Sequence, residues 1–247
     1  MSLELLPRLR VVLVETSHPG NIGAVARAMK TMGLARLALV EPKRFPCAEA
    51  TAMAAGADDI LYDATVHDTL DAALAGTAWV VGASARDRRR VDWPVLEPAP
   101  FASEALARAA DVEVALVFGR EHSGLSNDEL DRCHALLRIP TSADYHSLNL
   151  AAAVQVAAWE LREAALAGAT RPDDAGRARE SVAVADMEGF YAHLEQVLAE
   201  VGYLDRRSPR LLMRRLRRLF NRAQPDRPEL NILRGILAAT QRARRQG

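Results

Sequence analysis

The feature of the sequence that most constrains its fold is a series of short apolar runs separated by longer stretches of helical periodicity. The runs lie at residues 10–15, 37–40, 79–82 and 112–118, and the first is followed by turn-forming residues. Such runs, rich in β-branched side chains, are typical of buried strands. Strands that alternate with helices predict an α/β fold in which a parallel sheet carries helices on both faces.

The C-terminal part of the chain has a different pattern. An alanine-rich helix is predicted over residues 148–166, after which Gly, Ala, Pro, Asp and Arg gather. We interpret this composition as a linker at residues 169–185. The linker divides the chain into a first domain at residues 1–168 and a small helical extension at residues 186–247.

Apolar residues in the extension recur at helical spacing from Met187 to Val201. Two more helices are predicted, over about residues 209–221 and 228–242. In the first of these, the pattern predicts that four arginines face outward while Leu212, Leu216, Leu219 and Phe220 are buried.

Charge is distributed unevenly along a chain whose formal net charge is zero. Residues 1–170 contain 16 Lys and Arg against 22 Asp and Glu, a net charge of −6. Residues 171–247 contain 16 Arg against 10 Asp and Glu, a net charge of +6. A basic appendage on an acidic body favours an acidic partner such as nucleic acid. A solvated basic surface without a specific partner is the alternative.

The remaining composition argues against several classes of protein. Cys47 and Cys133 belong to no Cys-x-x-Cys or Cys/His spacing, so neither a disulfide nor a structural metal site is expected. The N-terminal residues lack the apolar core of a signal peptide, and no apolar stretch is long enough to span a membrane. We therefore expect a cytoplasmic protein with neither a metal nor a membrane partner.

The first loop with chemical potential follows the first predicted strand. Asn21, Gly23 and Arg27 occur where a helix begins. The exposed N–H groups and the dipole at such a helix start suit a phosphate. Asn21 could also be the N-cap of the helix, and Arg27 could be an ordinary solvated arginine.

The second loop directly follows the strand at residues 112–118. Gly119 and Gly124 flank Arg120, Glu121 and two further polar residues. Glycines at these positions predict a close approach of the backbone to a ligand. The Gly-x-Ser-x-Gly elbow of a serine hydrolase is absent, which argues against that class.

The third loop precedes the long alanine-rich helix. Ile139 and Pro140 are followed by Ser147 and Asn149, one of which is expected to cap the helix. Since ligands bind beyond the carboxyl ends of parallel strands, the three loops predict one polar ligand site. A dinucleotide site is not favoured, because no Gly-x-Gly-x-x-Gly follows the first strand.

Taken together, the three loops resemble the motifs of the SPOUT class of trefoil-knotted methyltransferases, specifically those that methylate ribose 2′-hydroxyls. The first motif corresponds to Asn21, Gly23 and Arg27, the second to residues 118–125, and the third to residues 139–140 with 147–151. They occur in family order, and the resemblance covers about residues 8–166. It implies a deep C-terminal knot, S-adenosylmethionine as cofactor, and a homodimer whose subunits share the RNA site.

The extension resembles the C-terminal part of a bacterial tRNA cytidine/uridine 2′-O-methyltransferase family that modifies nucleotide 32 of the anticodon loop. Residues 213–223 and 230–237 carry this resemblance. It implies that the substrate is tRNA. Two alternatives are a ribosomal RNA 2′-O-methyltransferase on the same fold and an RNA-binding module without catalytic activity.

The resemblance also implies roles for individual residues, including a loop after a mid-domain strand at residues 84–87. Residues expected to bind the methyl donor are Ser84, Ala85, Gly119, Arg120, Glu121, Ile139, Pro140, Ser147, Leu148 and Asn149. Residues expected to arrange the reaction are Arg27, Asn21, Glu121, Ser147 and Asn149. Residues expected to contact RNA are Arg214, Arg215, Arg217 and Arg218.

Overall fold

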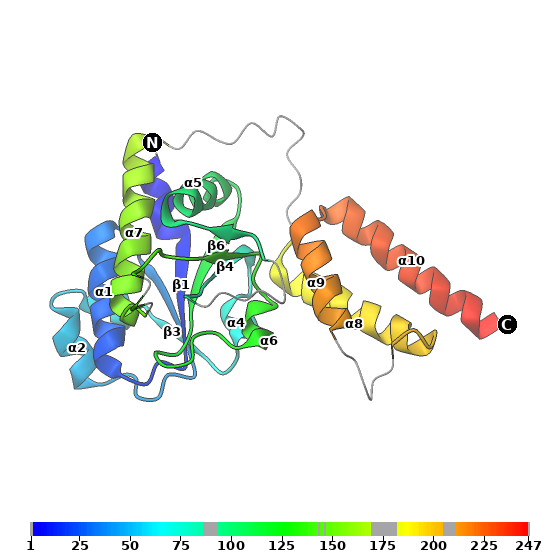
Figure 1. The fold of residues 1–247 in the computed structure, drawn as a ribbon, viewed down its shortest axis with the longest axis horizontal. Helices are drawn as coiled ribbons and strands as arrows, with labels where there is room; N and C mark the ends of the chain where they lie inside the picture. The colour runs from blue at the N-terminus through cyan, green and yellow to red at the C-terminus, as the bar shows by residue number, and fades with distance from the viewer. Residues whose placement is uncertain are drawn as a thin grey trace. The chain divides into compact units, whose positions relative to one another are not determined.

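The computed structural model describes residues 2–85, 93–142, 144–145, 147–168, 182–204 and 211–246. The chain divides into two compact units, Met1–Asp174 and Ala175–Gly247. In Figure 1 the first unit contains the sheet and the second consists of helices. Arg86 and Asp87, in the loop predicted after the mid-domain strand, and residues 169–181 of the predicted linker lie outside the described residues.

The first unit is built on a parallel sheet of seven described strands in the order β3-β2-β1-β6-β4-β7-β5. At its centre, Val12 pairs with Ala38 on one side and with Val117 on the other. All recorded pairings between these strands are parallel, which confirms the predicted sheet. The strands are β1 (Leu9–Val14), β2 (Arg36–Val40), β3 (Thr65–His67), β4 (Thr77–Ala83), β5 (Val95–Leu96), β6 (Glu113–Phe118) and β7 (Ala135–Leu137).

Helices cover both faces of the sheet, as predicted (Figure 1). The helical elements are η1 (Ser2–Arg8), α1 (Pro19–Met32), α2 (Ala48–Ala54), α3 (Asp58–Tyr62), α4 (Leu70–Ala73), α5 (Pro98–Ala109), α6 (Asn127–Leu130) and α7 (Leu150–Ala167). Helix α7 packs against both α1 and α5, and the three helices share a core with Val11, Leu39 and Val81. On the opposite face, the sheet packs against α6. A Cβ on residue 82 would lie 2.8 Å from the sulfur of Cys133 and 3.5 Å from Leu130 of α6, so the glycine allows this close packing.

The starts of α1 and α7 differ in a way that matters for the site. Helix α1 begins at Pro19 with His18 as its N-cap, because proline is favoured in the first turn, where its missing N–H costs nothing. Asn21 is therefore inside the first turn, and the alternative in which it caps α1 is wrong. At α7, Oδ1 of Asn149 accepts from the N–H groups of Ala151 and Ala152, which confirms a cap at one of the two expected residues.

The second unit consists of α8 (Val184–Glu200), α9 (Leu212–Ala223) and α10 (Arg227–Gln246). Its core contains Phe190 and Tyr191 of α8 together with Leu230 of α10. The rings of Phe190 and Phe220 meet edge to face with 4.9 Å between their centres. The three predicted helices are confirmed, although residues 209–210 of the second lie outside the described residues. Within the described ranges, no helix has both the length and the hydrophobicity needed to cross a bilayer.

Candidate functional site

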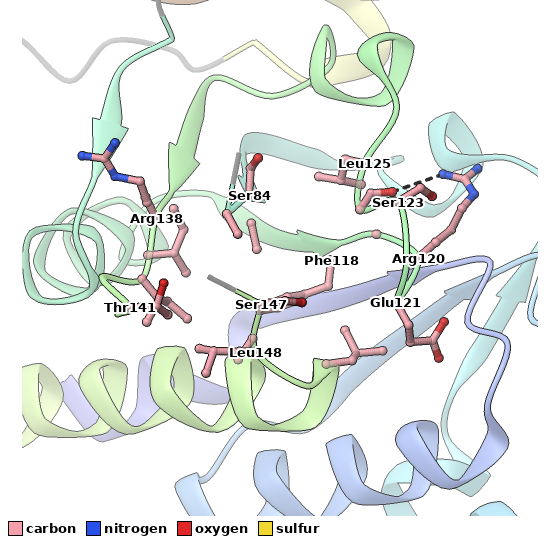
Figure 2. Close-up of a pocket in the computed structure, with 18 of the residues that line it drawn as sticks. Ser84, Phe118, Arg120, Glu121, Ser123, Leu125, Arg138, Thr141, Ser147 and Leu148 are labelled. Carbon is pink, nitrogen blue, oxygen red and sulfur yellow. Dashed lines mark hydrogen bonds between the residues drawn. The ribbon is translucent and has the colours of Figure 1, made fainter. Parts of the chain in front are cut away.

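A cavity of about 900 Å³ opens at the carboxyl ends of β4, β6 and β7, which are neighbours in the sheet. Three strand-end loops and the first turn of α7 form its walls (Figure 2). The volume lies within the range of small-molecule sites. Lining residues come from 83–85, 118–125, 137–141, 147–148 and 150, together with Glu97 and Ala153.

The structure brings most of the predicted donor-binding residues to this cavity. Those that line it are Ser84, Ala85, Gly119, Arg120, Glu121, Ile139, Pro140, Ser147 and Leu148. Of the residues predicted to arrange the reaction, Glu121 and Ser147 line the cavity, whereas Arg27, Asn21 and Asn149 are not among its lining residues.

Glu97, Arg138 and Thr141 also line the cavity, although none of them was predicted as a site residue. Glu97 is the N-cap residue of α5, directly before Pro98. A proline at a helix start was the available signal for this position. In the view of Figure 2, Arg138 and Arg120 lie on opposite sides of the cavity.

The loop after β6 folds back tightly on itself. The N–H of Gly124 donates to the carbonyl of Arg120 over 2.8 Å, and Gly124 has a left-handed φ of 67°. A Cβ on residue 119 would lie 2.2 Å from the carbonyl carbon of Gly124 and 2.3 Å from the nitrogen of Leu125. Glycine at 119 is thus required by the loop's own backbone, which is a reason separate from the predicted close approach of a ligand.

Arg120 is held by two carboxylates. Its guanidinium donates to Glu129 over 3.0 Å and forms an ion pair with Glu15, which follows β1. The hydrogen bonds that Arg120 donates to Glu15 and to Glu129 raise the pKa of Arg120 above its already high ordinary value. Glu129 also completes a capping box with Ser126 at the start of α6. Arg120 therefore fastens the loop after β6 to its neighbours while it lines the cavity.

Glu121 is the centre of a second cluster. Its Oε2 accepts from the N–H of Ser17 at 3.1 Å and from the Ser17 hydroxyl at 2.9 Å. Its Oε1 accepts from the N–H of His18 at 3.2 Å and from Nδ2 of Asn21 at 3.0 Å. Burial opposes ionisation, but the hydrogen bonds from Asn21, Ser17 and His18 outweigh it and lower the pKa of Glu121 to about 2. Glu121 is therefore a carboxylate at neutral pH.

The first motif contains one packing residue and one exposed cation. A Cβ at Gly23 would lie 2.0 Å from the carbonyl oxygen of Ala50, so this glycine allows α1 and α2 to pack closely. The side chain of Arg27 is exposed on α1. Among the described residues, Arg27 has no ion-pair partner.

The arginines of α9 are not equivalent. Arg217 is turned toward α8, where its guanidinium pairs with Glu188 and lies 4.4 Å from the centre of the Tyr191 ring. The expectation that Arg217 faces outward is therefore wrong, because a half-buried carboxylate and an aromatic ring hold it. Leu219, predicted to be buried, is 47% exposed. Its position in the helical repeat places it on the side opposite Arg217.

No group of three or more His, Cys, Asp or Glu side chains able to hold a metal ion occurs within the described part of the chain. The polar side chains that line the cavity carry carboxylate, guanidinium, imidazole and hydroxyl groups, and they lie among aliphatic side chains and Phe118. This lining suits an organic ligand that has both apolar and polar faces.

Two parts of the chain match models of known protein families. Residues 8–159 match the model of the SpoU rRNA Methylase family, and residues 185–247 match the C-terminal domain of the tRNA methyltransferase TrmJ. The chain belongs to the SpoU methylase family. The resemblance found in the sequence motifs is thereby confirmed. The second match confirms the resemblance of the extension to the TrmJ C-terminal domain.

Two curated SpoU relatives are similar over nearly their full lengths. A protein of Sodalis glossinidius, named tRNA (cytidine/uridine-2′-O-)-methyltransferase TrmJ, is 52% identical over 95% of this chain and 92% of its own. A protein of Pseudomonas aeruginosa, named tRNA (cytidine/uridine/adenosine-2′-O-)-methyltransferase TrmJ, is 51% identical over 98% and 96%. The crystal structure of TrmJ from Z. mobilis matches with a TM-score of 0.81 at 30% identity, covering 94% of this chain and 98% of that one.

Proposed function

We propose that this protein transfers the methyl group of S-adenosylmethionine to the 2′-hydroxyl of a ribose in tRNA, in the cytoplasm. The observation that carries the proposal is the cavity formed by the loops after β4, β6 and β7 and the start of α7, which contains residues of the second and third motifs, in a chain of the SpoU methylase family. The match of the second unit to the TrmJ C-terminal domain supports tRNA as the substrate. Both curated relatives are named as tRNA 2′-O-methyltransferases.

The cavity fits the donor chemically. Leu125, Ile139 and Leu148 provide apolar walls for a purine, and the hydroxyls of Ser84 and Ser147 lie on the lining for polar contacts. Glu97 and Glu121 are also among the lining residues, and their negative charges favour a cationic ligand. When bound, S-adenosylmethionine supplies a methyl group attached to a positively charged sulfur. Alignment of the ribose oxygen with this methyl group is the main task of the protein.

We assign Arg27 to the ribose and its phosphate. A guanidinium remains protonated in proteins, so it is unsuited to accept the proton of the hydroxyl. Two parallel N–H groups can instead hold a phosphate and stabilise the negative charge that grows on the attacking oxygen. The exposure of Arg27 on α1 keeps its guanidinium available to RNA.

A homodimer with a shared RNA site accounts for the position of Arg27. Within one chain, this residue is not among those that line the donor cavity. A second copy that brings its own Arg27 to the cavity would complete the site. We therefore propose that the active form is a dimer, in which each cavity uses residues of both subunits.

We propose that the basic face of α9 binds the tRNA backbone. Arg214, Arg218 and Arg222 repeat every four residues and so lie along one side of the helix, next to Arg215. Arg217 belongs to the α8 contact instead. Phosphate contacts by arginine provide affinity without sequence choice. Residues 186–247 are accordingly proposed as the tRNA-binding extension of a catalytic domain at residues 1–168.

The proposal is tested by incubating the full-length protein with labelled S-adenosylmethionine and either tRNA lacking 2′-O-methyl groups or ribosomal RNA. We expect label in tRNA, at nucleotide 32 of the anticodon loop. Label in ribosomal RNA alone would assign the protein to the other substrate class. No label in either RNA, together with tRNA binding, would identify a non-catalytic RNA-binding module.

A further inference from the structure

Ser17 has no role in the three motifs, yet it contacts Glu121 of the second motif. It lies in the loop between β1 and α1, and both its N–H and its hydroxyl donate to Oε2 of Glu121. These are contacts across 104 residues of sequence. Glu121 in turn accepts from Asn21, and Asn21 accepts at its Oδ1 from Nδ2 of Asn149 over 3.0 Å.

We propose that Ser17 is a positioning residue for the donor site: through Glu121 and Asn21, it fixes the amide of Asn149 and thereby the start of α7. The inference rests on the proposed function, because the start of α7 forms part of the proposed donor cavity. Ser147 and Leu148 line that cavity and directly precede Asn149.

Asn149 links Asn21 to the start of α7, because both its amide oxygen and its amide nitrogen form hydrogen bonds. Its Oδ1 accepts from the N–H groups of Ala151 at 2.9 Å and Ala152 at 3.4 Å, which ties it to the first turn of α7. Its Nδ2 is tied to Asn21. A shift of Asn21 therefore moves the cap of α7 and, with it, the two lining residues before the cap.

The carboxylate of Glu121 holds neighbouring residues in place and is not directed at the reacting atoms. Its two oxygens accept from four donors, which belong to Ser17, His18 and Asn21. In Figure 2 its carboxylate points away from Ser147. Hydrogen bonds to an ionised carboxylate are stronger than those between neutral groups. Loss of the Ser17 hydroxyl therefore removes one of the stronger links in the cluster.

The test compares three variants of the full-length protein by calorimetric titration with S-adenosylmethionine. We expect Ser17→Ala to weaken donor binding by about 10-fold, the lower end for a hydrogen bond to a charged group. Ser17→Thr keeps the hydroxyl and should remain within about twofold of wild type. Ser103→Ala removes an exposed hydroxyl of α5, which donates to Ala99, and serves as the matched control with unchanged binding.

A double-mutant cycle tests whether Ser17 acts through Asn149, which it does not touch. The Ser17→Ala and Asn149→Ala changes should together weaken donor binding by less than the product of their separate effects, because both interrupt one chain of hydrogen bonds. Multiplicative effects would overturn the inference, as would Ser17→Ala binding the donor like wild type. Circular dichroism verifies that each variant is folded at the temperature of the titration.

The test of Ser17 and the test of the proposed function can fail independently of each other. If the wild-type protein binds S-adenosylmethionine but methylates no RNA, the proposed reaction fails while the Ser17 effect on binding still decides the inference. If wild type methylates tRNA and Ser17→Ala retains full donor affinity, the reaction stands and the positioning role of Ser17 is wrong.

Discussion

The guanidinium of Arg217 lies 4.4 Å from the centre of the Tyr191 ring and donates to both carboxylate oxygens of Glu188. The hydroxyl of Tyr191 in turn donates to Oδ1 of Asn221 on α9. Burial raises the pKa of Tyr191 far above its ordinary value, so it keeps its proton across the physiological range. These contacts join α8 to α9, and they separate a structural arginine from the basic face beside it.

Neutral substitutions should distinguish the two kinds of arginine in α9. Arg215→Gln should reduce the dependence of tRNA affinity on salt by about one unit of slope, as expected for one lost phosphate contact. Arg217→Gln should leave that slope unchanged and instead destabilise the contact between α8 and α9 by about 2 kcal/mol. Filter binding at several salt concentrations measures the slope. Hydrogen exchange of the α8 and α9 amides measures the local stability.

The two arginine variants control for each other, since both remove one positive charge from the same helix. Equal losses of salt dependence would show that Arg217 also contacts RNA. An unchanged slope in Arg215→Gln would exclude that residue from the RNA-binding face.

Arg27→Lys should lower the rate of methyl transfer by about 100-fold or more, because an ammonium lacks the two parallel donors of a guanidinium. Affinity for S-adenosylmethionine should remain within about twofold of wild type, since we assign Arg27 to the ribose and its phosphate rather than to the donor. Single-turnover kinetics and donor titration separate the two effects. Near-normal turnover in Arg27→Lys would refute a bidentate role.

Gly119→Ala should abolish donor binding by displacing the loop after β6. The added Cβ would meet backbone atoms of Gly124 and Leu125, which cannot turn aside as a flexible side chain can. Overpacking of this kind costs about 1–3 kcal/mol, in addition to the effect on the site. Gly235→Ala is the matched control, because its Cβ meets nothing within 4 Å and alanine favours a helix. Full donor affinity in Gly119→Ala would contradict the account of this loop.

His134 should make the first unit sensitive to acid. Its Nδ1 accepts from the N–H of Val80 on β4 over 3.0 Å, and burial, together with the positive charge of Arg108, lowers the pKa of His134 to about 4. Between the folded pKa of about 4 and the ordinary value of 6.5, the unfolded chain binds more protons than the folded chain. Stability should therefore fall with decreasing pH across this window, by about 2 kcal/mol from pH 7 to pH 5.

Urea unfolding followed by tryptophan fluorescence measures this loss, because Trp79, Trp93 and Trp159 all lie in the first unit. His134→Asn keeps an acceptor for Val80 and removes the titrating group. The variant should be less sensitive to pH across the same range. An equal pH dependence in wild type and variant would assign the loss to other groups.

The sequence predicted the elements that are long and apolar. Strands β1, β2, β4 and β6 follow from their aliphatic runs, and α7 follows from its alanine-rich repeat. Strands β3, β5 and β7 have only two or three residues and no alternation that could be read. They form because neighbouring strands supply their hydrogen-bond partners, which is information that a single segment does not contain. The deep knot stays a prediction from the family resemblance, since it depends on chain threading rather than on local pattern.

The site was predictable where backbone position decides the contact. Residues of the loops after β4, β6 and β7 meet because the carboxyl ends of these strands are adjacent, whereas Asn21 and Arg27, which follow β1, are not among the lining residues. Contacts between distant side chains were not predictable. The repeat of α9 predicted that Arg217 faces outward, which is wrong because its partner, Glu188, lies on another helix. The link from Ser17 to Glu121 spans two loops that meet only in the folded sheet.

The most direct test of the central claim is to map the methyl group that the protein adds to unmodified tRNA. A methyl group on a ribose 2′-oxygen removes the hydroxyl needed for alkaline cleavage, so the labelled nucleotide should survive hydrolysis as an alkali-resistant dinucleotide. We predict such a dinucleotide containing nucleotide 32, formed by wild type and reduced at least 100-fold with Arg27→Ala. Label recovered as an alkali-sensitive base-methylated nucleotide, or formed equally by Arg27→Ala, would contradict the account.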